Sequence, residues 1–259
     1  MSQNTRIKDW GGRRVWVIGA SSGIGKAFSE ALIKRGARVA LSARNASALE
    51  SLAEGAQAGQ TLVLPMDVNN GAEIEKAYAQ LEDAWSGFDL LVLLAGTHLP
   101  VRAWELNAGE AEQLFRTNVF GVIRALTLVI PDLVKKGEGG IAVVSSVAGY
   151  CGLPTSLVYG ASKAALINFT ETLYLDLRPK GISVYLVNPG FVRTPLTDRN
   201  PFEMPALISA EDAATHMLKG FSDGEFEIHF PKRFTRLMKL LRILPYRLFF
   251  PLVHRFTGL

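Results

Sequence analysis

The sequence predicts a single α/β domain built on a doubly wound parallel sheet of about seven strands. Three observations indicate this fold class. The chain has 259 residues, of which 48% are hydrophobic, enough for one domain with a large core. Short apolar runs alternate with longer segments of helical periodicity as far as residue 230. The apolar run at 89–96 lacks polar alternation, as expected for a strand that is buried on both faces of a parallel sheet.

The first strand is predicted from Val15 to Ala20, and it ends in Gly-Ala-Ser-Ser-Gly-Ile-Gly. A helix follows over 26–35. Glycines in such a turn let the backbone approach a phosphate, and the helix N-terminus supplies N–H donors and positive charge. The Gly-x-x-x-Gly-x-Gly spacing differs from the commonest dinucleotide fingerprint, so a purely structural turn is the alternative. The strand before it and the helix after it favour a dinucleotide site.

A second strand is predicted over 38–42, followed by Ala43-Arg44-Asn45. An acidic residue at this place would bind the ribose hydroxyls of NAD, and none is present. The Arg44 guanidinium instead suits the 2′-phosphate of NADP. The alternative is a solvated arginine, but its position after the glycine turn favours a cofactor role and therefore NADP(H).

Further strands are predicted at 61–68 and 89–96, with a helix over 72–85 between them. The first of these strands ends in Asp67-Val68, where the chain can meet the adenine of a nucleotide. A long helix over 110–136 then contains Asn118. Because asparagine is a poor helix former, the simplest interpretation of this residue is an exposed polar position.

A fifth strand is predicted over 140–144 and a helix over 156–177, with a glycine- and proline-rich break between them. On that helix Tyr159 and Lys163 lie four residues apart and share one face. An ammonium beside a phenol lowers the phenol's pKa, which makes Tyr159 a candidate general acid or base. Ser146, just after the strand, can hydrogen-bond a substrate oxygen there. A Tyr-x-x-x-Lys match alone is common by chance.

The remaining strands of the domain are predicted at 182–188 and 225–230, the former closing on Pro189-Gly190. Over roughly residues 12–225 the chain resembles the short-chain dehydrogenases/reductases. The resemblance rests on the glycine turn, Asp67-Val68, Ala95-Gly96, Asn118, Ser146, Tyr159-x-x-x-Lys163 and Pro189-Gly190. It implies a Rossmann-like fold, a nicotinamide cofactor and, by analogy alone, a homo-oligomer.

The resemblance also implies roles for the matching residues. Tyr159 would exchange a proton with the substrate, Lys163 would tune Tyr159 and hold the nicotinamide ribose, and Ser146 would orient the substrate oxygen. Asn118 would anchor a water that links Lys163 to solvent. The cofactor would be held by Gly19, Ser21, Ser22, Gly23, Ile24, Gly25, Arg44, Asp67, Val68, Ala95, Gly96, Tyr159, Lys163, Pro189, Gly190, Val192 and Thr194.

Two positions depart from the family pattern. Leu93-Leu94 stand where the family carries two asparagines, whose amides brace the central sheet. Ser22 stands where some NADP-dependent members carry a basic residue, so the predicted cofactor preference rests on Arg44.

The chain is predicted to comprise a catalytic domain over 1–230, with a substrate lid at about 193–209, and an extension over 231–259. Within the lid, the segment 200–207 carries Phe202, Met204 and Leu207, which indicates an apolar substrate. In the extension, residues 232–244 predict a helix with one apolar side. That side comprises Phe234, Leu237, Met238, Leu241 and Leu244.

The extension also carries most of the excess positive charge. Seven lysines and arginines and no acidic residue follow Glu227, whereas residues 1–227 hold 21 basic and 24 acidic residues, a net charge of −3. Uneven charge of this kind indicates a local cationic surface and argues against nucleic-acid binding. Contact of residues 232–256 with an anionic membrane is predicted, and the alternatives are a partner subunit and packing on the chain's own domain.

A single cysteine, Cys151, excludes a disulfide framework and indicates a reducing compartment. The polar first fourteen residues lack the apolar core of a signal peptide, and no segment is predicted to span a membrane. A cytoplasmic location is therefore expected, with peripheral attachment if the extension binds lipid. No metal-ligand spacing involves Cys151, and no metal site is predicted.

The sequence thus predicts an NADP(H)-dependent oxidoreductase that acts on a carbonyl or secondary alcohol of an apolar or lipid-like small molecule. Reduction of 3-oxoacyl thioesters is the alternative activity. A non-catalytic NADPH-binding regulator or scaffold is the alternative class of protein, and the complete set of catalytic residue types argues against it.

Overall fold

The fold is that of a computed structural model that describes residues 2–199 and 204–257. Its strands form one parallel sheet in the order β3-β2-β1-β4-β5-β6-β7. The fold class predicted from the sequence is confirmed. The strands are β1 (Arg14–Ile18), β2 (Arg38–Ser42), β3 (Thr61–Val63), β4 (Leu90–Leu93), β5 (Gly140–Val144), β6 (Ser183–Pro189) and β7 (Glu227–Phe230).

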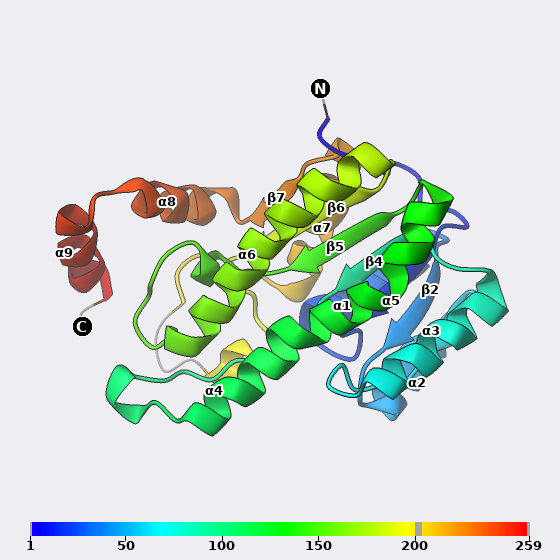
Figure 1. The fold of residues 1–259 in the computed structure, drawn as a ribbon, viewed down its shortest axis with the longest axis horizontal. Helices are drawn as coiled ribbons and strands as arrows, with labels where there is room; N and C mark the ends of the chain where they lie inside the picture. The colour runs from blue at the N-terminus through cyan, green and yellow to red at the C-terminus, as the bar shows by residue number, and fades with distance from the viewer. Residues whose placement is uncertain (1, 200–203, 258–259) are drawn as a thin grey trace.

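Helices cover both faces of the sheet (Figure 1). Apolar residues of α1, α2 and α7 pack on one face, and those of α3, α5 and α6 pack on the other. The helices are α1 (Gly23–Ile33), α2 (Ala46–Ala53), α3 (Gly71–Trp85), α4 (Ala108–Phe115), α5 (Gly121–Lys136), α6 (Leu157–Leu177), α7 (Ala210–Asp223), α8 (Lys232–Ile243) and α9 (Tyr246–Thr257).

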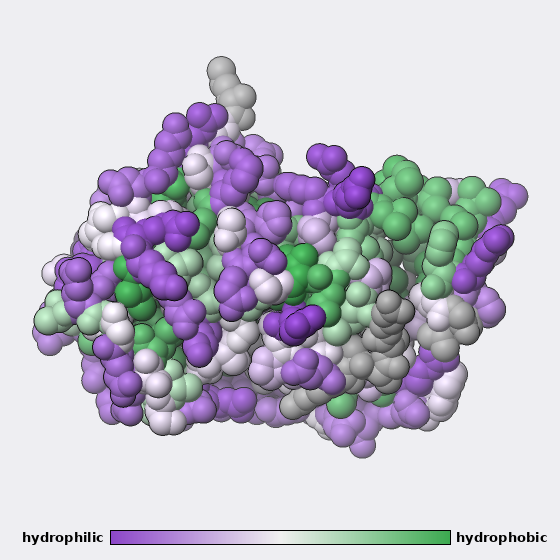
Figure 2. Space-filling view, turned by 180° about the vertical axis from the view of Figure 1, so that it is seen from behind, coloured by the Kyte–Doolittle hydropathy of each residue, from purple (hydrophilic) through white to green (hydrophobic). Residues whose placement is uncertain are grey.

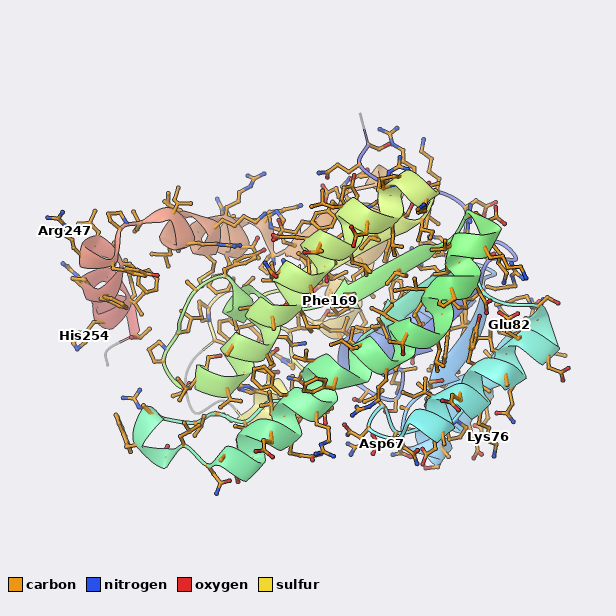
Figure 3. The ribbon with its side chains drawn as sticks, in the orientation of Figure 1. Asp67, Lys76, Glu82, Phe169, Arg247 and His254 are labelled. Atoms are coloured by element: carbon orange, nitrogen blue, oxygen red, sulfur yellow. The ribbon has the colours of Figure 1, made fainter. Side chains whose placement is uncertain are left out.

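The sequence pattern did not predict three of these helices, α2, α7 and α9. Short side chains define the start of two of them, because Asn45 accepts a hydrogen bond from Ala48 N and Ser209 accepts one from Asp212 N. The predicted third strand, 61–68, is shorter in the structure and ends at Val63. Residues 64–68 continue as a loop toward α3, and they carry Asp67 to the edge of the sheet (Figure 3).

The predicted helix over 110–136 is interrupted by a π turn at Arg116–Phe120, between α4 and α5. By length and composition, the continuous stretch 108–136 could cross a membrane, although no spanning segment was predicted. Core helices of soluble proteins pass the same test, and this helix packs Val122, Leu126 and Val129 against the sheet. We therefore assign it to the core of the domain.

The extension packs on the domain through one side of α8. Met238 is 4% exposed, and Phe234 and Leu241 pack around it in a cluster with Val147 and Ile167. The predicted apolar side therefore divides: Phe234, Met238 and Leu241 face the domain, Leu244 is half-buried, and Leu237 is exposed. The reason is that β7 leads directly into α8, which leaves this helix lying against the loop after β5 (Figure 1).

Candidate functional site

The candidate site lies at the carboxyl edge of the sheet, where the loops after β1, β4, β5 and β6 meet. Because β1 has β2 on one side and β4 on the other, the chain order reverses between β1 and β4. Ligands of open α/β sheets bind at such a switch point, outside the carboxyl ends of the strands.

The glycine turn after β1 is shaped by backbone contacts that exclude any side chain. Gly19 has a φ of +103°, and a Cβ there would lie 2.7 Å from Ala95 N. A Cβ on Gly25 would overlap the carbonyl oxygen of Gly19. A Cβ on Gly23 would lie 2.8 Å from Thr194 Cγ2, so the loop after β6 closes over the turn. Neighbouring atoms therefore leave no space for a side chain at these three positions, as predicted for glycines in this turn.

The N-terminus of α1 remains available to an anion. Its N-cap residue, Ser22, makes no side-chain capping bond, and the first turn of the helix carries no acidic residue. Backbone N–H donors at such a terminus bind phosphate well. Ser21 and Ile24 are half-buried in the same turn. These features fit the pyrophosphate of a dinucleotide.

Arg44 lies close to this turn and is exposed. Gly19 N and Ala20 N donate hydrogen bonds to Ser42 O at 2.7 and 3.1 Å, which joins the turn to the end of β2. Arg44 follows two residues later, and Asn45 is occupied as the N-cap of α2. No acidic side chain stands at 43–45. The structure thus leaves a cation beside the place where a ribose would sit.

Asp67 and Val68 lie beside the same edge of the sheet. Asp67 Oδ1 accepts a hydrogen bond from Asn69 N at 2.9 Å, and its backbone N–H donates to Glu73 Oε2 at 2.7 Å. Val68 is buried against Gly121, the first residue of α5. These contacts fix the backbone of the loop and leave the Asp67 carboxylate partly exposed.

Ser146, Tyr159 and Lys163 converge between β5 and α6. Ser146 follows β5 and hydrogen-bonds the Tyr159 hydroxyl. Lys163 Nζ lies 5.7 Å from the centre of the Tyr159 ring and donates to Val144 O at 3.0 Å. Ser145 Oγ donates to Lys163 O at 2.7 Å, which fastens α6 to the end of β5. The structure therefore brings the predicted catalytic side chains together.

Burial dominates the electrostatics of this group. It raises the pKa of Tyr159, and the hydrogen bond with Ser146 offsets only part of that rise. The sequence predicted a lowered pKa for Tyr159, whereas its pKa is raised, because burial outweighs the effects that favour the phenolate. Burial also lowers the pKa of Lys163 to about 8, because the ammonium is removed from water. Tyr159 is consequently held in its protonated form, as a proton donor requires.

Asn118 is fully buried in the π turn, which rules out the alternative of an exposed polar position. Its Oδ1 accepts from Thr97 N at 2.7 Å, and its Nδ2 donates to Thr97 O at 2.9 Å and to Ser162 Oγ at 3.2 Å. A Cβ on Gly96 would lie 3.3 Å from Asn118 Oδ1 and 3.7 Å from Lys163 Nζ. Asn118 thus joins the loop after β4 to α6, and π turns of this kind are frequent at functional sites.

The two leucines that replace the family's asparagines are accommodated by packing. Leu93 is buried in the cluster between the sheet and α5, and Leu94 packs on the opposite face. Leu94 N still donates to Ile18 O at 2.8 Å. Burial of apolar surface at the centre of the sheet thus takes the place of side-chain hydrogen bonds.

The loop after β6 carries the remaining predicted cofactor contacts. Pro189 ends β6, and Gly190 N donates to Phe230 O at 2.7 Å. Val192 is buried and pairs with Ile208, so both ends of the predicted lid meet at one place. Thr194 and Thr197 form a hydrogen-bonded turn near Gly23. Part of the lid, including Phe202, falls outside the described residues.

Two features of the site were not predicted from the sequence. His98, near the end of β4, is buried with its ring edge-to-face against Tyr159 at 4.5 Å between centres. Glu227 accepts hydrogen bonds from Tyr150, Asn188 and Lys239, which ties the loop after Ser146 to α8. Burial acts to raise the Glu227 pKa, but these hydrogen bonds outweigh it and hold the pKa below its usual range. The sequence signal was only that His98 stands two residues after Gly96 and Tyr150 four residues after Ser146.

A cavity of about 640 Å³ lies on the other side of α6, between that helix and α9. Its lining is mostly apolar and includes Leu153, Leu157, Phe249 and Val253. Ser146, Tyr159 and Lys163 do not line it. The cavity is therefore separate from the candidate catalytic group.

Comparisons with known proteins agree with the fold. The family model described as short chain dehydrogenase matches residues 13–203. An uncharacterized oxidoreductase from Myxococcus xanthus is 37% identical over 243 residues, covering 92% of this chain and 94% of the relative. A short-chain dehydrogenase/reductase from Burkholderia phymatum in complex with NAD superposes with a TM-score of 0.81 at 26% identity, over 90% of this chain and 94% of the other. One from Sphingobium yanoikuyae in complex with NADPH gives 0.77 at 26% identity, over 90% and 96%.

Proposed function

This chain belongs to the short chain dehydrogenase family, and we propose that it is an NADP(H)-dependent oxidoreductase acting on a carbonyl group or a secondary alcohol. The observation that carries the proposal is the convergence of Ser146, Tyr159 and Lys163 beside the glycine turn. A protein that only bound the cofactor would need the turn but not a buried phenol with a serine and a lysine.

The fit to a dinucleotide rests on this chain's own groups. The turn excludes side chains at three positions, the N-terminus of α1 offers free donors, and the loop after β6 closes to within contact distance of Gly23. Gly96 lies beside Asn118 and Lys163, where a side chain at position 96 would crowd Asn118. When bound, the reduced nicotinamide supplies the hydride.

The side chains divide the remaining work of reduction. Tyr159 donates its hydroxyl proton to the substrate oxygen as negative charge develops there. Ser146 donates a hydrogen bond to the same oxygen and orients it. The Lys163 ammonium stabilises the phenolate that forms when Tyr159 gives up its proton. Asn118 hydrogen-bonds the Thr97 backbone and Ser162. It therefore fixes the loop after β4 against α6.

The preference for NADP(H) rests on Arg44. Solved relatives occur with either cofactor, so family membership does not decide the matter. Arg44 is exposed next to the turn, with no carboxylate at 43–45 to bind ribose hydroxyls. A charged hydrogen bond contributes about 1.5 to 3 kcal/mol, or roughly tenfold to a hundredfold in affinity.

We therefore expect NADPH to bind more tightly than NADH, by roughly tenfold or more. The Arg44→Ala variant should lose most of that difference without weakening NADH binding. Fluorescence titration of both cofactors measures it, with Arg38→Ala as a control at the other end of the same strand. Equal affinities for the two cofactors in the unmodified protein would falsify the assignment of Arg44.

The proposed substrate is an apolar or lipid-like carbonyl compound, supported by half-buried Met204 and Leu207 in the lid. A panel of ketones, aldehydes and 3-oxoacyl thioesters of graded chain length tests it by following NADPH oxidation. We expect kcat/KM to rise with chain length. If thioesters dominate the panel, the alternative activity holds. If NADPH binds but no compound is reduced, the protein is a cofactor-binding regulator and the enzymatic proposal is wrong.

A further inference from the structure

Large apolar side chains are exposed mainly on the C-terminal helices. Seven of the thirteen that are exposed among the described residues lie in α8 and α9, including Ile243 at 76%, Tyr246 at 74% and Phe256 at 76%. The others of this group are Leu237, Leu240, Leu248 and Phe250. Figure 2 shows the corresponding apolar area over this end of the molecule, bordered by hydrophilic residues. Contiguous exposed apolar surface on a folded chain usually marks an interaction site.

These helices are held on the domain, so their outer surface is a fixed feature of the fold. The inner side of α8 packs through Met238, and Phe234 lies against Phe191 with 5.5 Å between ring centres. Lys239 pairs with the buried side of Glu227. On α9, Phe249 is buried and Tyr246 stacks on Phe250 at 5.4 Å. Packing on the domain therefore buries the inner side of α8 and leaves its outer side exposed.

The exposed charges of α8 and α9 that form no ion pair are all positive. Of the seven basic residues after Glu227, Lys232 and Lys239 pair with Glu225 and Glu227. The other five are exposed and form no ion pair with any residue that the structure describes. They are Arg233, Arg236, Arg242, Arg247 and Arg255. Figure 3 shows Arg247 at the outer side of α9, pointing away from the sheet. The two helices thus expose aromatic, aliphatic and arginine side chains together.

We propose that α8 and α9 form a docking surface for an anionic lipid bilayer, on which the protein lies without spanning it. Arginines next to an anionic surface contribute electrostatic attraction, and apolar side chains inserted at the headgroup boundary add an independent hydrophobic contribution. Each helix has 12 residues and a break at Pro245 separates them, whereas a spanning helix needs about 20. The surface therefore binds in the plane of the membrane.

A second copy of the chain fits this surface less well. Two such surfaces placed face to face would bring ten unpaired arginines together, and like charges in contact disfavour association. A bilayer containing acidic lipids neutralises them. Docking would also bring two loops of the domain near the lipid, because α8 contacts both. Phe234 of α8 lies against Gly190. Lys239 of α8 and Tyr150 both hydrogen-bond Glu227. The docking proposal does not depend on the proposed reaction.

Flotation of the intact protein with vesicles tests the proposal directly. We expect binding to phosphatidylcholine vesicles that contain phosphatidylglycerol and much weaker binding to pure phosphatidylcholine vesicles. Raising the salt concentration should weaken the binding, since it screens the arginines, but should not abolish it, because apolar insertion is insensitive to salt. Binding is expressed as a partition coefficient.

The charge contribution is tested by Arg236→Gln with Arg247→Gln. Because each basic residue near the surface contributes about 1 kcal/mol, the partition coefficient should fall about 30-fold. The matched control is Lys8→Gln with Lys180→Gln, two exposed lysines outside the C-terminal helices, which should change it less than about twofold. The apolar contribution is tested by Ile243→Ser, which should reduce the salt-resistant part of the binding. Leu175→Ser, at an exposed position of α6, is its control and should leave that part unchanged.

Truncation after Phe230 is a poor test, because it removes Met238 and Lys239 from the domain and would expose their buried partners. Truncation after Leu244 removes α9 alone and should leave a soluble protein with weaker vesicle binding. The proposal is overturned if the intact protein ignores anionic vesicles, if the control lysines matter as much as the two arginines, or if Ile243→Ser changes only the sedimentation mass. The last result would assign the surface to a second copy.

Discussion

Replacing Tyr159 with phenylalanine is expected to lower kcat by about 10²-fold or more. The substitution keeps the ring, which packs edge-to-face on His98, and removes only the hydroxyl that hydrogen-bonds Ser146. Without that hydroxyl, the developing alkoxide has no proton donor. Stopped-flow or steady-state NADPH oxidation with the best substrate of the panel measures the loss.

The control is Tyr174→Phe, the same change on the same helix. The hydroxyl of Tyr174 donates to Gln3 O, far from Ser146 in the chain's fold, so its loss should leave turnover within about twofold. NADPH affinity should be nearly unchanged in both variants. Near-normal turnover in Tyr159→Phe would remove this residue from the mechanism, whatever the fate of the other predictions.

Replacing Lys163 is expected to damage catalysis and cofactor binding together. In Lys163→Met the buried stem remains but the ammonium is lost, so packing between α6 and β5 should survive. We expect kcat to fall by about 10²-fold. The NADPH dissociation constant should rise by roughly tenfold to a hundredfold, the contribution of a charged hydrogen bond to the ribose. The double role is wrong if cofactor affinity is untouched. Lys76→Met, on the outer side of α3, serves as control (Figure 3).

The same lysine predicts a pH dependence. Burial lowers the Lys163 pKa to about 8, so the ammonium is lost as the pH rises through that value. The kcat/KM of the unmodified enzyme, which reports the free enzyme, should therefore fall above about pH 8. Lys163→Met should retain no inflection there. Because the folded pKa lies below the unfolded one, the unfolded chain binds more protons between them, and stability should rise slightly over that interval.

The candidate catalytic residues could be found in the sequence largely because their spacing is local. Tyr159 and Lys163 lie four residues apart, so helical periodicity puts them on one face. Ser146 follows a strand, and right-handed connections between parallel strands limit where that strand lies in the sheet. The glycine turn was equally readable, since only residues without a Cβ permit its contacts with Ala95 and Thr194. Whether a segment forms a helix or a strand depends mainly on its local hydrophobic periodicity, which is clear over most of this sequence.

Predictions that depended on surroundings were less successful. The Tyr159 pKa was expected to fall because the sequence shows a nearby lysine, but desolvation by the folded chain raises it. For Asn118, local pattern also allowed an exposed position, and only the π turn, which carries it into the site to bond Thr97, decides against that alternative. His98 carries no motif, and only the packing of the β4 loop on α6 places its ring against Tyr159.

By itself, the sequence determined the parallel sheet, the glycine turn, the candidate catalytic trio and the cationic C-terminal extension, all of which follow from residue type at short spacing. Tertiary structure alone decided which side of α8 faces the domain. Helical periodicity groups Leu237 with Met238, but the loop after β5 takes up Met238, while Leu237 and Ile243 remain exposed among unpaired arginines. Burial is a property of the neighbours that the fold supplies, and these lie far away in the chain, where no local pattern records them.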